Sequence, residues 1–228
     1  MKNANYYMVF DFETLGTNPH VHEIVQIGSV MLHPRTLEIT KGSEFCSWVK
    51  PDSFDGSFKE KNLDVLNWHA KNFETTVDDI YNRIENAPSE KHVWDSWVSY
   101  MKEYYVAGKP KRSSNAPILA GFNIFNFDKI IFDRLAIKYK NVDKHGSPNI
   151  YQSRDTIDVM KIAYLWNESN IDMPNLKADT VRQKCKIEPS GNAHDALYDA
   201  IDTAEMLSRY LRMHRNVAAT RWGQRQYK

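Results

Sequence analysis

The stretch YYMVFDFET at residues 6–14 decides the fold that we expect for this chain. Its aromatic and β-branched residues predict a β-strand. Strand side chains alternate between faces, so Asp11 and Glu13 share one face while Phe10 and Phe12 take the other. Two carboxylates on a hydrophobic strand are unfavourable unless they are neutralised. A divalent cation such as magnesium or manganese would neutralise them, although an acid pair at the water boundary of an edge strand gives the same pattern.

The rest of the chain predicts further strands, joined first by turns and then by helices. Residues 23–32 and 44–49 predict two strands that continue an antiparallel meander, and residues 117–122 and 151–156 predict two more. The predicted helices cover residues 63–71, 77–86, 90–105, 128–139, 157–165, 176–184 and 195–214. This order predicts an α/β fold in which helices cover both faces of a mixed five-stranded sheet.

The composition indicates one domain with a sizeable core. The 228 residues contain no low-complexity stretch or linker, so we expect a single domain over residues 1–228, with a helical insertion at about 60–110 and a basic C-terminal tail at about 212–228. Hydrophobic residues make up 42% of the chain. In the predicted helix at residues 90–105, four large apolar side chains recur at helical spacing, a pattern that is more typical of a packed core than of a surface for stacking bases. The four residues of this stripe are Val93, Trp97, Met101 and Tyr104.

Membrane-spanning and disulfide-rich classes are excluded by the same composition. The mean hydropathy is -0.60, and no apolar run approaches the roughly 20 residues of a membrane span. The first residues lack the hydrophobic region of a signal peptide. Cys46 and Cys185 are too few for a disulfide framework and lack the spacing of a zinc site. We therefore expect a reducing, cytoplasmic setting.

The net charge of +1 argues neither for nor against nucleic acid, but the basic residues are unevenly distributed. After Glu205 the chain has no acidic residue, and a second basic cluster occupies residues 109–112. Such clusters can follow phosphates, and a solubilising tail would look the same. The basic residues after Glu205 are Arg209, Arg212, Arg215, Arg221, Arg225 and Lys228.

Two later segments carry further candidate acids. Asp128 lies where a short strand gives way to a helix, and a helix start favours an acid; a simple N-cap, by Asp128 or Asn126, is the alternative. His194 and Asp199 open the last helix. Residues five apart on a helix do not share a face, so the two meet only if His194 lies in the loop before the helix. Taken alone, His194 also fits an ordinary loop histidine.

Together the three segments resemble the DEDDh group of 3′→5′ exonucleases over about residues 6–212. The matching residues are Asp11, Glu13, Asp128, His194 and Asp199. The stretches DFETLGTNP at 11–19, GFNIFNFD at 121–128 and SGNAHDALYDA at 190–200 are most similar to exonuclease I. The stretch LDVLNWHAK at 63–71 instead resembles phage-type exonuclease A.

The resemblance implies a ribonuclease H-like fold and two Mg²⁺ or Mn²⁺ ions about 3.5–4 Å apart. By this analogy Asp11 bridges both ions, while Glu13 and Asp199 complete the site that holds the attacking water. Asp128 supports the second ion, and His194 accepts the proton of that water as general base. The expected products are 5′-mononucleotides.

The same analogy implies a grip on the terminal nucleotide by Phe12, Thr14, Leu15, Asn123 and Phe127. Single-stranded DNA is the favoured substrate because of the likeness to exonuclease I, and RNA is the alternative, since the two differ at the 2′-hydroxyl. An internally cutting nuclease on the same fold and a non-catalytic binding module are the rival classes. Four tryptophans are candidates for stacking on bases. They are Trp68, Trp94, Trp166 and Trp222.

Overall fold

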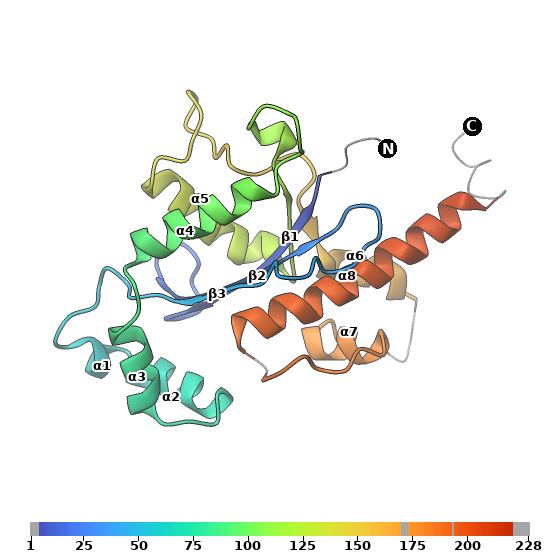
Figure 1. The fold of residues 1–228 in the computed structure, drawn as a ribbon. Helices are drawn as coiled ribbons and strands as arrows, with labels where there is room; N and C mark the ends of the chain where they lie inside the picture. The colour runs from blue at the N-terminus through green and yellow to red at the C-terminus, as the bar shows by residue number, and fades with distance from the viewer. Residues whose placement is uncertain (1–4, 170–172, 193, 221–228) are drawn as a thin grey trace.

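The protein folds around one mixed five-stranded sheet of order β3-β2-β1-β4-β5, in a computed structural model that describes residues 5–169, 173–192 and 194–220 (Figure 1). The strands are β1 (Tyr7–Thr14), β2 (Ile24–Leu32), β3 (Phe45–Trp48), β4 (Ile118–Gly121) and β5 (Ile157–Asp158). The first three pair antiparallel, as the predicted meander requires, and β4 and β5 run parallel to β1. The predicted mixed sheet is therefore confirmed.

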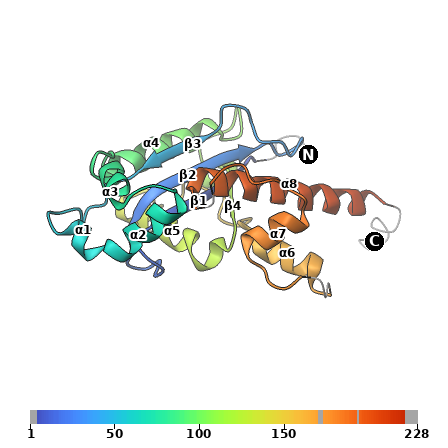
Figure 2. The ribbon, with the colours of Figure 1, turned by 90° about the horizontal axis from the view of Figure 1, so that it is seen from below.

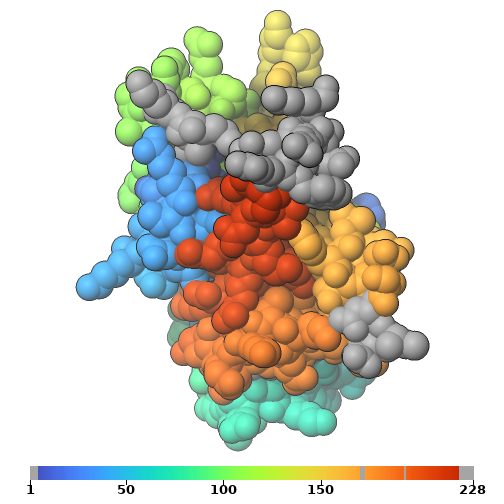
Figure 3. Space-filling view, turned by 90° about the vertical axis from the view of Figure 1, so that its right-hand side faces the viewer, coloured from blue at the N-terminus to red at the C-terminus, as the bar shows by residue number. Residues whose placement is uncertain are grey.

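Helices cover both faces of the sheet, as predicted. Helices α4 and α5 lie on one face and α6, α7 and α8 on the other (Figures 1 and 2). The α-helices are α1 (Phe58–Lys61), α2 (Leu63–Asn72), α3 (Val77–Glu85), α4 (Glu90–Glu103), α5 (Asp128–Lys138), α6 (Val159–Asn167), α7 (Ala178–Lys184) and α8 (Ala196–Ala219). Seen from its α8 side, the molecule has helices α1–α3 at one end and the loops around residues 110 and 145 at the other (Figure 3).

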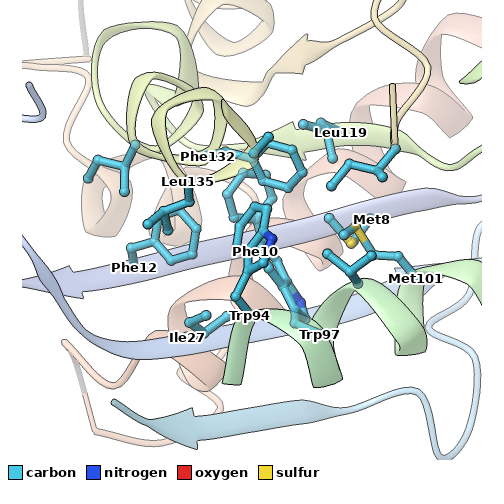
Figure 4. Close-up of a cluster of buried hydrophobic side chains, with 14 of the residues drawn as sticks. Met8, Phe10, Phe12, Ile27, Trp94, Trp97, Met101, Leu119, Phe132 and Leu135 are labelled. Carbon is cyan, nitrogen blue, oxygen red and sulfur yellow. The ribbon is translucent and has the colours of Figure 1, made fainter. Parts of the chain in front are cut away.

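The alternation predicted for β1 separates two hydrophobic cores. Phe10 and Phe12 enter the core beneath α4 and α5, where their rings contact Trp97 (Figure 4). Val9 faces the opposite way, into the core beneath α8. The predicted stripe on α4 is part of the first core, and the buried indole N–H of Trp97 donates to Ser29 Oγ at 2.8 Å. The core interpretation of that stripe is confirmed.

Helices α1 to α3 form a third, smaller cluster beside the sheet. Its buried members include Phe58 and Leu66 around Val25 of β2. Helix α3 begins at a capping box in which Thr76 and Asp79 each accept a backbone N–H of the other, an arrangement that satisfies donors at a helix start. This cluster presents α2 to one end of β1.

One predicted strand is wrong. Residues 152–155 form a turn, in which Gln152 Oε1 accepts the Arg154 N–H at 2.7 Å. The strand β5 follows at Ile157–Asp158 and has only two residues, too few for a hydrophobic pattern. The next helix therefore begins at Val159, with Asp158 as its N-cap.

The basic tail begins as the last turns of α8. Arg212 Nη2 donates to the Thr36 carbonyl at 2.7 Å, and Arg215 donates to the carbonyls of Pro34 and Arg35. These two guanidinium groups therefore tie the helix to the loop after β2. Arg221, Arg225 and Lys228, like Trp222, lie outside the described residues. In the described ranges, no helix combines the length and the apolar character needed to cross a membrane.

Candidate active site

Four of the five predicted catalytic residues line one pocket of about 260 Å³. Asp11 and Glu13 come from β1, His194 from the loop before α8, and Asp199 from the first turn of that helix. One potential ligand atom from each of Glu13, His194 and Asp199 lies within 4.8 Å of the other two. Segments about 180 residues apart in the chain thus meet at one point.

Asp128, the fifth, does not line this pocket but binds the backbone of Phe12, which does. It is the first residue of α5 and is only 4% exposed. Its Oδ1 accepts the backbone N–H of Phe12 at 3.1 Å, which fixes the carboxylate between Asp11 and Glu13 along β1. The N-cap of α5 is Phe127, which has no side-chain cap. The N-cap interpretation of Asp128 and Asn126 is therefore wrong.

Burial and neighbouring negative charges raise the pKa of all four carboxyl groups. Burial raises the pKa of Asp11 and of Glu13 well above the usual range, and the neighbouring carboxylates raise both further. Burial also raises the pKa of Asp128 and of Asp199 to about 7. Four negative charges are not stable in this space without a cation. Their oxygen donors are those that Mg²⁺ and Mn²⁺ prefer, so the residues present fit divalent metal ions.

His194 is held over the first turn of α8 by an unusual backbone conformation. Its φ is +63°, which is left-handed and uncommon for a residue other than glycine. Its backbone N–H donates to Asp199 Oδ2 at 3.1 Å, and Asp195 caps the helix by accepting the Leu197 N–H. Burial lowers the pKa of the imidazole. His194 is therefore neutral near pH 7, the form that accepts a proton.

A glycine allows α8 to come this close to the sheet. Gly28 pairs with Asp11 across β1 and β2. A Cβ at Gly28 would lie 2.1 Å from the backbone carbon of Ala196, which is the first residue of α8. Beside it, Gln26 Oε1 accepts the Ala196 N–H at 3.1 Å. The strand thus positions the helix start that carries Asp199.

Helix α2 closes the other side of the site, which the sequence did not predict in detail. The Trp68 ring lies 4.6 Å from that of His194. The neighbouring His69 is buried, and its Nε2 donates to the Thr14 carbonyl at 3.1 Å. Its Nδ1 lies 3.8 Å from Glu13 Oε2. Burial lowers the pKa of His69, so this contact is not an ion pair near pH 7.

A second pocket, of about 410 Å³, adjoins the carboxylates between β1 and α2. Three of the five predicted substrate-binding residues line it, together with three residues of α2. The first three are Phe12, Thr14 and Phe127, and the α2 residues are Asp64, Val65 and Trp68. Leu15 instead packs on the α1–α3 cluster, and Asn123 lines neither pocket. Of the four candidate tryptophans, Trp68 lines this pocket and Trp94 is buried in the core.

Arg182 also lines the first pocket, but its charge is neutralised by neighbours. Its Nε lies 3.3 Å from Asp202 Oδ2, and its Nη2 lies 3.1 Å from Asp179 Oδ1. Its Nη1 donates to the Ile187 carbonyl at 3.0 Å. Arg182 therefore anchors α7 to α8 and does not pair with Asp11, Glu13, Asp128 or Asp199 in the described chain.

This fold and this acidic cluster define the class of DEDDh 3′→5′ exonucleases. The chain belongs to the family described as the 3′-5′ exoribonuclease Rv2179c-like domain, whose model matches residues 5–211. The protein is therefore a 3′→5′ exonuclease with a ribonuclease H-like fold. No curated protein sequence is significantly similar to it.

Solved structures share the fold at low sequence identity. The nuclease domain of 3′hExo, a DEDDh family member bound to rAMP, has a TM-score of 0.63 at 19% identity, with 92% of each chain covered. Cell-death related nuclease 4 has a TM-score of 0.62 at 14% identity, with 92% of this chain and 64% of that chain covered. E. coli exonuclease I in complex with a dT13 oligonucleotide has a TM-score of 0.62 at 16% identity. That match covers 98% of this chain but only 43% of exonuclease I.

The close approach at Gly28 predicts a large effect of one methyl group. Gly28→Ala forces the start of α8 away from β2, and a misplacement of about 1 Å lowers kcat/KM by about 100-fold. Overpacking also lowers the free energy of unfolding by about 1–3 kcal/mol. Gly56→Ala is the control, because its Cβ would meet no atom within 4 Å. Steady-state kinetics with unchanged kcat/KM in Gly28→Ala would contradict this account of the helix position.

The raised carboxyl pKa values predict how metal and pH act together. Between the ordinary pKa of 3.8 and the raised value of about 7 for Asp128 and Asp199, the folded protein binds more protons than the unfolded chain. The metal-free protein therefore loses stability as the pH rises through this window. Metal binding needs the ionised carboxylates, so Mn²⁺ should raise the Tm more at about pH 8 than at about pH 5.

Melting curves with Mn²⁺ and with a chelator, at both pH values, test this prediction. Asp199→Asn should reduce the effect of Mn²⁺, because it removes one carboxylate from the cluster. Asp78→Asn is the matched control, since Asp78 is exposed and lies on α3. Equal Mn²⁺ shifts at the two pH values would show that the raised pKa values do not govern metal binding.

Proposed function

We propose that the protein removes nucleotides one at a time from the 3′ end of a single-stranded nucleic acid, by a two-metal mechanism with His194 as general base. The observation that carries this proposal is the convergence of Glu13, His194 and Asp199 within 4.8 Å beside Asp11. A two-metal mechanism with a general base needs carboxylate ligands and a proton acceptor at one point, and these residues would supply both.

The four carboxylates would hold two Mg²⁺ or Mn²⁺ ions. By the resemblance to DEDDh exonucleases, Asp11 is the candidate to share both ions, with Glu13 and Asp199 helping to hold one ion and Asp128 the other. Divalent ions in such sites activate water and stabilise charge on the transferring phosphoryl group. The pKa values raised by crowding support this assignment, because binding of cations removes the repulsion.

His194 would accept the proton of the attacking water. Its lowered pKa keeps it neutral near pH 7, and its ring reaches the same space as the Glu13 and Asp199 carboxylates. Trp68 packs against the ring and Asp199 holds the backbone N–H, so the base is positioned from two sides. The alternative that this geometry also allows is that His194 binds a metal ion together with Glu13 and Asp199.

The apolar pocket beside Glu13 is the proposed site of the terminal nucleobase. Phe12, Phe127 and Trp68 line it, and aromatic side chains stack on any base without regard to sequence. A base in this pocket would direct the last phosphodiester toward the carboxylates. Helix α2 would then contribute both to binding of the terminal nucleotide and to the position of His194.

The identity of the sugar distinguishes two candidate substrates. The likeness of three motifs to exonuclease I predicts single-stranded DNA, and the relative bound to dT13 has this fold. The family description, 3′-5′ exoribonuclease, and the relative bound to rAMP favour RNA as the second candidate. Both cysteines are free, which supports a reducing, cytoplasmic setting for either substrate.

Matched DNA and RNA oligonucleotides test this point. Each carries the same sequence and a 5′ label, and kcat/KM for removal of the first nucleotide is compared. A DNA preference of about 10-fold or more, which corresponds to about 1.4 kcal/mol, supports DNA. The reverse ratio identifies RNA, and a circular strand that is cut internally would contradict exonuclease action altogether.

Replacement of His194 tests the general base. His194→Ala should lower kcat by about 10²–10⁴-fold, the usual contribution of a positioned base, while Mn²⁺ affinity stays close to that of the original protein. Asp199→Ala is the companion variant and should abolish both nucleotide release and normal Mn²⁺ affinity. A His194→Ala variant that loses Mn²⁺ affinity as Asp199→Ala does would make His194 a ligand instead.

Replacement of Trp68 tests the nucleobase pocket. Stacking on an aromatic side chain contributes about 1–3 kcal/mol per base, so Trp68→Ala should raise KM by about 5- to 100-fold, and Trp68→Phe should restore most of it. Trp166→Ala is the control because Trp166 is exposed to a similar extent on α6. If the two alanine variants have equal KM values, the stacking role is wrong.

A further inference from the structure

A basic pocket lies at the end of the molecule opposite to α1–α3. It measures about 470 Å³ and is lined by four cationic side chains, none of them accompanied by an acidic lining residue in the described chain. Lys102 comes from the end of α4, Lys111 and Arg112 from the loop that follows, and Lys140 from the residues after α5. In Figure 1 these two loops lie together at the top of the molecule.

These four cations are not used to hold the fold together. Within the described ranges, none of them has an ion pair or a side-chain hydrogen bond to the protein. In this they differ from Arg212 and Arg215, whose guanidinium groups bind backbone carbonyls. Two of the four, Lys111 and Arg112, belong to the basic cluster at residues 109–112, which the carboxylate site does not use.

The neutral residues of the pocket also offer donors. Trp94 Nε1 donates to Asn141 Oδ1 at 2.6 Å. An indole N–H can only donate, so this bond fixes which side-chain atom of Asn141 is the oxygen. The amide NH₂ of Asn141 is left with no acceptor in the described chain. The Tyr105 hydroxyl already donates to the Ile150 carbonyl. A pocket of cations and N–H donors suits a ligand of negative charge with several acceptor oxygens, such as a phosphate.

We propose that this basic pocket binds the phosphodiester backbone of the substrate strand, upstream of the 3′-terminal nucleotide. The proposal rests on the proposed function. The basic pocket lies near the N-terminal end of β1. Asn5, two residues before that strand, donates to the carbonyls of Ser114 and Ala116, which follow the pocket residues Arg112 and Ser113.

Helix α5 leads from the carboxylates to the pocket, because its first residue is Asp128 and it ends at Lys138, two residues before Lys140; its 11 residues span about 16 Å at roughly 1.5 Å per residue. A strand stacked as in B-DNA, which rises about 3.4 Å per nucleotide, covers this distance with about five nucleotides, and a more extended strand covers it with fewer.

The exposure of the four cations is consistent with a nucleic-acid strand as the ligand of the basic pocket. The four cations are exposed at the rim of the pocket, where several phosphates in a row can reach them. Contacts from lysine and arginine to phosphates are independent of sequence, which an enzyme that shortens strands stepwise requires. A longer substrate would thus be held at two places, at its 3′ end by the carboxylate site and upstream by this pocket.

A triple variant, K102Q/K111Q/R112Q, tests the proposal. Lys140 is left unchanged because its φ of +58° makes substitution there a risk to the fold. On a strand of about 20 nucleotides, KM should rise by about 10-fold, and the slope of log Kd against log salt should fall by about 2, or about 0.7 for each lost phosphate contact. On a trinucleotide, which is too short to reach the pocket, kcat and KM should not change.

The charge-matched control is K41Q/K161Q/K184Q, which removes three exposed lysines from other surfaces. The proposal is overturned if the triple variant affects long and short strands equally, or affects neither. It is also overturned if inorganic phosphate stabilises the original protein but not the triple variant while KM for the long strand is unchanged, because the pocket then binds a small free anion.

A measurement of binding without catalysis distinguishes this proposal from the proposed function. Affinity for the long strand is measured in metal-free buffer, where no nucleotide is released, and the loss of salt dependence in the triple variant is read there directly. Failure to release nucleotides from the trinucleotide would refute the proposed function alone. Unchanged binding of the long strand by a triple variant that still degrades trinucleotides would refute the basic pocket alone.

Discussion

Repulsion among buried carboxylates is the constraint on which this structure depends. Burial raises the pKa of Asp11, Glu13, Asp128 and Asp199, and the charges of neighbouring carboxylates raise each of these pKa values further. Such an arrangement costs stability in the metal-free protein, so the rest of the fold must hold the four side chains together. The same negative charge would favour the binding of divalent cations, which requires the ionised carboxylates. Stability is thus lowered at the place where the reaction needs negative charge.

Three contacts from different parts of the fold hold the carboxylates against this repulsion. The Phe12 N–H binds Asp128, and the absence of a side chain at Gly28 lets α8 approach the sheet. The His194 N–H donates to Asp199 and ties the loop before α8 to that helix. Large apolar side chains beneath β1 keep that strand in place (Figure 4). The cores therefore determine catalytic geometry, and a small change in packing far from the substrate should alter the rate.

The sequence was informative where one local rule decides the structure. Alternation along β1 placed Asp11 and Glu13 together, and the five-residue spacing placed His194 in a loop. The strand expected at 151–156 was wrong, because a two-residue strand has no pattern of its own and is defined only by pairing with β4. The closeness of Gly28 to α8 and of His69 to Glu13 could not be predicted either, since both follow from packing between distant segments.

The most direct test of the central claim is the pattern of products from a single-stranded oligonucleotide that carries a 5′ label. With Mg²⁺ or Mn²⁺ the account predicts a ladder that shortens by one nucleotide at a time from the 3′ end, with release of 5′-mononucleotides and complete arrest by a chelator. Internal fragments from a strand whose 3′ end is blocked, or shortening that continues after the chelator is added, would contradict a metal-dependent 3′→5′ exonuclease.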